Sequence, residues 1–252
     1  MSDIMVWPRL VVVGGWGVRA EMLSALYGFW PGEVVPVSLD DELLFRCNSV
    51  ADVAEELLSL YPEPSVWMGW SLGSQIVMEA AYRQTGSVFC AITLGGFPKF
   101  VADESWPRGM EAGAFKAFVR GIGRDPERYW LHFLLLMING ADDEKQERQR
   151  LKIWLKKGTP VSHDHLCKSL EWLAIGDQRP LWQSLALPVL HLAGEKDVVV
   201  GPWASDLRLP GLSHLSVVEG MAHWPGGCSA GQCWGMIRSF MADKPEMSAW
   251  AQ

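Results

Sequence analysis

The sequence predicts an α/β fold in which helices flank a mostly parallel sheet and a helical lid is inserted near the middle of the chain. Short apolar runs bounded by glycine and proline alternate with segments of helical periodicity before residue 103 and after residue 182. Such alternation indicates parallel strands joined by right-handed crossovers. At 252 residues the chain is long enough for one large domain. We therefore expect a core of residues 1–102 and 183–252 and a lid of residues 103–182.

The first part of the core contains short continuous apolar runs of the kind that form strands buried on both faces. These runs are Leu10–Val13, Val34–Leu39, Val66–Gly69 and Val88–Leu94. Two segments between them, Ser49–Leu60 and Leu72–Tyr82, repeat apolar residues at helical spacing. After the lid, the same rules predict strands at Pro188–Ala193 and His214–Glu219 and a closing helix at Gln232–Ala242.

The lid has no strand-like run, and its apolar periodicity predicts three helices. They span Pro126–Ile138, Asp143–Lys157 and Ser162–Ile175. Asp125 directly before Pro126 combines a favourable N-cap with proline at the first helical position. Ser162 is the cap candidate of the third helix.

Composition narrows the class of protein. A net charge of −7 argues against a nucleic-acid-binding protein, because no global basic field is present. No apolar stretch approaches the ~20 residues of a membrane-spanning helix, and the start of the chain shows no signal peptide. Five cysteines at irregular spacing indicate a reducing compartment. We expect a cytoplasmic, enzyme-like protein.

A motif at the end of the third predicted strand indicates a nucleophile. Gly69-Trp70-Ser71-Leu72-Gly73 matches G-x-S-x-G between a strand and a helix. That context produces a sharp elbow that exposes the serine hydroxyl, and glycine permits the tight turn. The context matters because composition alone yields roughly 0.2 matches in a chain of this length. The alternative is a serine in an ordinary strand-to-helix turn.

A serine hydroxyl needs a base to accept its proton and an acid to orient that base. His223 and Asp197 each follow a predicted strand, and they lie after Ser71 in the order acid then histidine. Because the carboxyl ends of strands gather at one edge of an open α/β sheet, we expect these side chains to meet. Glu195 is a rival for the acid.

Other histidines are weaker candidates for the base. His191 lies inside a strand run, His214 begins a strand, and His132 lies in the lid without a nearby partner.

An acyl-transfer serine also requires N–H donors for the oxyanion. We expect one from Leu72, the residue after the nucleophile, and one from Trp16 in the glycine-rich loop after the first strand. The alternative for that loop is a turn needed only for chain reversal.

No cofactor or metal motif is evident. The glycine-rich loop lacks the full dinucleotide fingerprint, and no P-loop is present. His163-Asp164-His165 and the pair Cys228 and Cys233 lack the further ligands of a metal site. We expect neither a cofactor nor a metal.

The second lid helix is strongly basic. Residues 144–157 hold two acidic residues and six basic ones, namely Lys145, Arg148, Arg150, Lys152, Lys156 and Lys157. This pattern is typical either of a solvated helix with i,i+4 pairs or of a docking surface for an acidic partner. The apolar block before it, Phe133–Met137, is suited to packing and to lining an acyl channel.

These motifs resemble those of the pimeloyl-[acyl-carrier protein] methyl ester esterases of biotin synthesis, members of the α/β-hydrolase superfamily. The resemblance is carried by the elbow, the loop Gly15-Trp16-Gly17, the lid segments 103–107 and 177–179, and the positions of Asp197 and His223. It covers about residues 9 to 240. The chain departs from the family at Gly14, where the family usually has His, and His132 stands where a basic lid residue is expected.

The resemblance implies an α/β-hydrolase fold and hydrolysis of a carboxylic methyl ester to an acid and methanol. It implies a triad of Ser71, Asp197 and His223 and an oxyanion hole of Trp16 and Leu72. The implied acyl-chain contacts are Phe133, Leu134, Leu135, Leu136 and Met137. The implied partner is acyl carrier protein, with Arg128 and Lys145 at basic docking positions and Arg148 and Arg150 near another. Two alternatives stay open, namely a general short-chain carboxylesterase without carrier and a catalytically silent α/β-hydrolase used as a binding module.

Overall fold

The computed structural model describes residues 7–83, 86–201 and 207–243 and contains one sheet of six strands in the order β2-β1-β3-β4-β5-β6. Every neighbouring pair is parallel. The strands are β1 Leu10–Val13, β2 Val34–Val37, β3 Ser65–Trp70, β4 Val88–Leu94, β5 Val189–Gly194 and β6 Ser213–Val218. The predicted parallel sheet is confirmed, with β2 ending two residues early and β3 starting one residue early.

Burial follows position in the sheet. Strands β1 and β3 are buried along their whole length because helices cover both of their faces. The edge strand β2 is only partly buried and contains Pro36. Proline has no backbone N–H to donate to a neighbouring strand, and an edge strand tolerates this loss. The continuous apolar runs at β1 and β3 therefore form buried central strands, as the pattern predicted.

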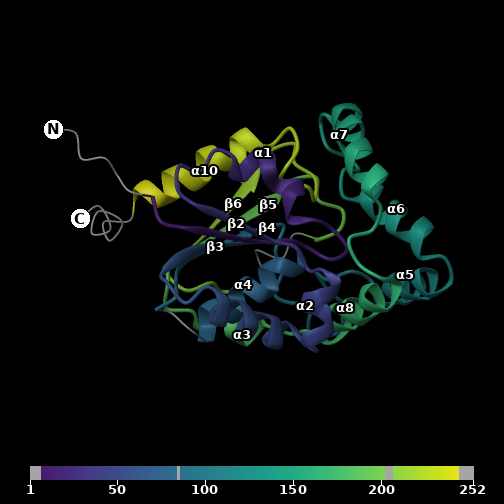
Figure 1. Cartoon of the computed structure of the whole chain (residues 1–252), viewed down its shortest axis with the longest axis horizontal. Coiled ribbons are helices and arrows are strands. Elements are labelled where there is room, and N and C mark those ends of the chain that lie inside the picture. The colour runs from purple at the N-terminus through teal and green to yellow at the C-terminus, as the bar shows by residue number, and fades with distance from the viewer. Residues whose placement is uncertain (1–6, 84–85, 202–206, 244–252) are drawn as a thin grey trace.

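Helices cover the sheet on both faces (Figure 1). On one face lie α2 Asp41–Arg46, α3 Val50–Leu60 and α4 Leu72–Arg83. On the other face, α10 Ala230–Ala242 packs beside the short helix α1 Ser24–Tyr27, which follows a 3-10 turn at Ala20–Leu23. The Ser49 hydroxyl accepts the Asp52 N–H at 3.0 Å and so caps α3. No helix in the described part of the chain is long and apolar enough to cross a membrane.

The inserted helices stand at one side of the sheet (Figure 1). They are α5 Ala112–Arg124, α6 Pro126–Leu136, α7 Glu144–Lys157 and α8 His163–Ile175, followed by the short α9 Arg179–Ser184. The prediction of only three lid helices was wrong, since it missed α5. That helix contains three glycines, which lower helix propensity, yet Phe115 and Ile122 bury its apolar face.

The two predicted N-caps of the lid helices differ in their hydrogen bonding. The Asp125 carboxylate accepts the Arg128 N–H at 3.1 Å, which confirms the predicted cap of α6. Ser162 stands at the N-cap of α8 but makes no side-chain cap hydrogen bond.

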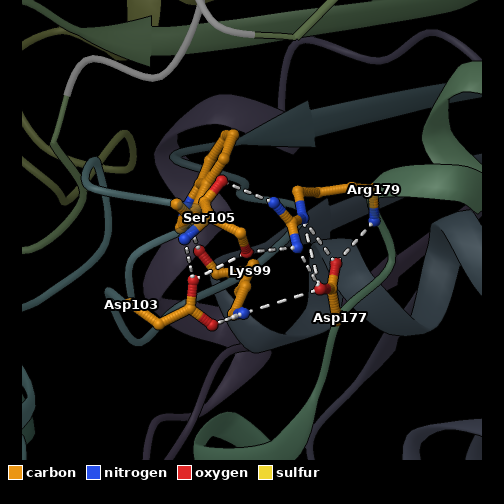
Figure 2. Close-up of polar contacts among 6 residues, drawn as sticks. Lys99, Asp103, Ser105, Asp177 and Arg179 are labelled. Atoms are coloured by element: carbon orange, nitrogen blue, oxygen red, sulfur yellow. Dashed lines mark hydrogen bonds and ion pairs between the residues drawn. The ribbon is translucent and has the colours of Figure 1, made fainter.

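The two ends of the insertion are tied together by a cluster that we call the lid clamp, consisting of Lys99, Asp103, Ser105, Asp177 and Arg179 (Figure 2). The Lys99 ammonium pairs with Asp103 and lies 3.6 Å from Asp177. Arg179 pairs with Asp177 at 2.6 Å and donates to the Ser105 carbonyl at 2.9 Å. The lid clamp therefore joins the two ends of the insertion. The exact boundaries of the lid at residues 103 and 182 stay a prediction.

The clamp depresses the pKa of both its carboxylates. Hydrogen bonding to Lys99 and Ser105 lowers the pKa of Asp103, and hydrogen bonding to Arg179 lowers the pKa of Asp177. Groups with depressed pKa values stabilise the folded state above their unfolded pKa, and this stability is lost as pH falls through the folded pKa.

We expect Arg179→Ala to lower Tm at pH 7 by about 2–4 °C, because a network of exposed ion pairs contributes about 1 kcal/mol. The difference from wild type should shrink below a pH of about 4, where the carboxylates begin to protonate. Thermal unfolding followed by circular dichroism measures both effects. Arg120→Ala, at an exposed cation on α5, is the control. A Tm difference that stays constant down to a pH of about 3 would contradict the electrostatic origin.

Candidate active site

Ser71 occupies a strained turn between β3 and α4. Its φ is +56°, which makes it the one non-glycine residue with positive φ in the described part of the chain. The Ser71 N–H donates to the Leu94 carbonyl at 2.9 Å, which fixes the turn against β4. A Cβ on Gly69 would collide with the backbone of Gly73, and a Cβ on Gly73 would collide with the backbone of Val13. The two glycines of the motif thus permit the elbow that exposes a nucleophile.

The sheet register brings the ends of four strands together. Gly69 pairs with Thr93, Leu94 with Leu192, and Gly194 with Val218, so β3, β4, β5 and β6 finish at the same edge.

The predicted acid and base meet at this edge. The His223 Nδ1 lies 2.7 Å from Asp197 Oδ2, and the exposed fractions of the two side chains are 0% and 3%. The other Asp197 oxygen accepts the N–H groups of Val199 and Val200, each at 2.9 Å. The carboxylate is therefore held on both oxygens and orients the imidazole. Its rival Glu195 is exposed and instead accepts the Gly220 N–H at 3.0 Å.

The remaining contact of the predicted triad is not made in this structure. The His223 Nε2 is buried, and among the described residues it has no hydrogen-bond partner. Ser71 is 6% exposed and lines the pocket described below. Proton transfer requires Ser71 Oγ to come within reach of this nitrogen. Such bonds are often long in the absence of substrate and tighten when it binds.

The two residues predicted to supply the oxyanion hole, Leu72 and Trp16, both lie close to Ser71. Leu72 begins α4, and the first N–H groups of a helix lack intrahelical acceptors. Gly15, next to Trp16, lies so close to the elbow that a Cβ there would come within 3.1 Å of Ser71 Cβ. The Trp16 indole donates to the Leu166 carbonyl at 3.0 Å, which ties the loop to α8.

A pocket of about 180 Å³ opens at Ser71 and is lined mainly by apolar side chains. From α6 it receives Phe133, Leu136 and His132. The other predicted acyl contacts lie elsewhere: Leu134 and Met137 are buried in the packing of the lid, and Leu135 is partly buried outside the lining.

Sequence reasoning missed most of the pocket lining outside α6, including the wall that α5 supplies. The missed lining residues from α5 are Ala114, Phe115 and Phe118. The Phe118 ring lies 5.6 Å from that of Trp16 in an edge-to-face contact. The spacing of Phe115, Phe118 and Ile122 is a helical signal that could have found this wall.

The basic residues predicted to dock a partner lie on the outer surface of the lid. Arg128 on α6 and Lys145, Arg148 and Arg150 on α7 are all exposed. Arg148 pairs with Glu144 at 2.8 Å in an i,i+4 arrangement, as a solvated helix face would also show.

Two of the other histidines, His191 and His165, make structural contacts. His191 is buried, lies 2.8 Å from the Thr93 hydroxyl and stacks on Trp182, and burial lowers its pKa to about 3. His165 pairs with Asp41 at 2.5 Å. Within the described ranges, no group of three or more His, Cys, Asp or Glu side chains is placed to hold a metal ion.

Comparison with known proteins agrees with this geometry. The model of the alpha/beta hydrolase family matches residues 10–228. A pimeloyl-[acyl-carrier protein] methyl ester esterase from Methylococcus capsulatus is 32% identical over 77% of this chain and 78% of its own length. One of the same name from Serratia marcescens is 30% identical over 92% of this chain and 93% of its own.

A solved esterase from Exiguobacterium antarcticum has the same fold, with a TM-score of 0.77 and 15% identity over 95% of this chain and 94% of its own. The chain belongs to the alpha/beta hydrolase family and, within it, to the family of the pimeloyl-[acyl-carrier protein] methyl ester esterases.

Proposed function

We propose that this protein is a serine hydrolase that cleaves the methyl ester of pimeloyl-[acyl-carrier protein], releasing methanol and the free acid. The 2.7 Å contact between His223 and Asp197 at the strand edge that also carries the Ser71 elbow is the observation that carries the proposal. The relatives of that name, which match most of the chain, support the substrate.

The proposed reaction has two acyl-transfer steps. Ser71 Oγ attacks the ester carbonyl while His223 Nε2 accepts its proton, and Asp197 stabilises the imidazolium. The N–H groups of Trp16 and Leu72 bind the oxyanion; losing one such donor typically costs ~100–1000-fold in kcat. The tetrahedral intermediate expels methoxide, which takes the proton from His223 and leaves as methanol. Water then attacks the acyl-enzyme by the same route, and Ser71 regains its proton.

The pocket supports an acyl substrate. Its walls from α5 and α6 are apolar and include Phe118, Phe133 and Leu136, which suits a methylene chain. Apart from Trp16, whose indole is bonded to Leu166, the polar lining residues are Ser71 and His132, so a carbonyl placed at Ser71 meets a hydrogen-bonding group there.

The exposed cations of α6 and α7 support an acidic carrier outside the pocket. A carrier held at Lys145, Arg148 and Arg150 would present its acyl chain to the lid, with Arg128 as a further contact. Five free cysteines agree with the cytoplasm as the proposed compartment.

Ser71→Ala should abolish covalent labelling by a fluorophosphonate and reduce ester hydrolysis by at least about 10⁴-fold, because the nucleophile is lost. Intact-mass spectrometry and a chromogenic ester assay measure the two effects. The exposed Ser162 provides the control Ser162→Ala, which should behave as wild type. Folded wild-type protein that takes no label would refute the serine mechanism and favour a silent binding module.

Reversing two charges of α7, Lys145→Glu with Arg148→Glu, should lower kcat/KM for the carrier-linked ester about 10-fold at low salt. Hydrolysis of free dimethyl pimelate should be unchanged, since the pocket is intact. The matched control reverses two exposed cations of α5, Lys116→Glu with Arg120→Glu. Equal kcat/KM for the carrier-linked ester in wild type and the α7 variant would support a general carboxylesterase instead.

A further inference from the structure

The loop that carries His223 is bonded to the lid as well as to the core. We define the histidine loop as residues 219–229, between β6 and α10, and the lid corner as residues 137–147, from the end of α6 into α7. The Met137 carbonyl accepts the His223 N–H at 2.9 Å and the Trp224 N–H at 3.1 Å. The backbone of the proposed base is thus held by a carbonyl of the lid.

Two more hydrogen bonds join the same segments. The Asp142 N–H donates to the Gly220 carbonyl at 3.2 Å. The Glu147 carboxylate accepts the Cys228 N–H through Oε1 at 2.6 Å. Together the contacts span the histidine loop on both sides of His223. A displacement of the lid corner would therefore displace the histidine loop as well.

Glu147 is unusual among the charged residues of α7. It is 4% exposed, whereas Lys145, Arg148 and Arg150 are exposed to solvent. Its second oxygen, Oε2, is buried and makes no hydrogen bond within the described part of the chain, and burial raises the pKa of this carboxyl. Burying a carboxyl group is costly unless its bonds compensate, so its presence here needs a reason beyond solubility.

The histidine loop is shaped to receive this side chain. A Cβ on Gly227 would collide with the Glu147 carboxylate, and its three nearest neighbours would all be atoms of that side chain. Gly227 and the Cys228 N–H therefore form a close-fitting seat for the carboxyl group.

We propose that Glu147 is a positioning residue for His223: seated on Gly227 and Cys228, it holds the histidine loop against the lid corner. The inference rests on the proposed Ser71 mechanism. The core supplies the other restraints, since the Trp70 indole donates to the His223 carbonyl at 2.9 Å and Asp197 orients the ring. The lid then contributes to the distance between His223 Nε2 and Ser71 Oγ, which is the link not made in this structure.

The test compares four single variants and one double variant in hydrolysis of p-nitrophenyl acetate, with active-site titration to count working enzyme. Glu147→Ala should lower kcat about 10- to 100-fold, the penalty expected for a misplaced catalytic group. KM should stay within about twofold, because the pocket is not touched. Glu147→Gln should stay within about threefold of wild type, because its amide oxygen can still accept the Cys228 N–H. Gln149→Ala, at an exposed residue of the same helix, should match wild type.

The fourth variant approaches the contact from the other side. Gly227→Ala should push the carboxyl group from its seat and lower kcat as Glu147→Ala does. The double variant combines Glu147→Ala with Gly227→Ala. Its new methyl group has no glutamate side chain to displace, so the kcat of the double variant should equal that of Glu147→Ala alone.

Three results would overturn the inference in an enzyme whose wild type is labelled at Ser71. They are an unchanged kcat in titrated Glu147→Ala, equal losses in Glu147→Ala and Glu147→Gln, and a loss expressed mainly as a higher KM. Wild-type protein that takes no fluorophosphonate would instead refute the proposed function, and the positioning role with it.

Discussion

Parallel strand pairing is the constraint on which the site depends. Positions 71, 197 and 223 are far apart in the chain, yet each follows the carboxyl end of a strand. Because all six strands run in one direction, those ends share one edge of the sheet. The largely buried strands β1, β3, β4 and β5 support that edge, and a strained residue such as Ser71 persists where the surrounding structure fixes it.

The lid encloses the site that the sheet edge positions. It supplies most of the apolar wall around Ser71 and, through Met137 and Glu147, bonds to the loop that carries His223. Its outer surface carries most of its cations, while its base is closed by ion pairs between Lys99, Asp177 and Arg179. The proposed carrier and the histidine loop would therefore lie on opposite sides of the same helices.

Much of this arrangement could be predicted from the sequence because it depends on local patterns. Continuous apolar runs marked the strands, and glycine around Ser71 marked the elbow. Helix α5 was missed because its glycines weaken the propensity signal, although Gly121 provides close contact for the Tyr129 ring. The contact between Glu147 and Cys228 joins positions 81 residues apart, so no periodicity announces it. The lid segments 103–107 and 177–179 carried the family resemblance, but nothing in their spacing predicted that their side chains meet in the lid clamp.

The central claim is that Ser71, His223 and Asp197 act as one unit. A crystal structure of the protein with Ser71 phosphonylated tests it most directly. The account predicts a phosphonyl oxygen within hydrogen-bond distance of the Trp16 and Leu72 N–H groups and His223 Nε2 about 2.6–3.2 Å from Ser71 Oγ. An adduct whose imidazole stays beyond that reach, with the phosphonyl oxygen turned away from both N–H groups, would contradict it.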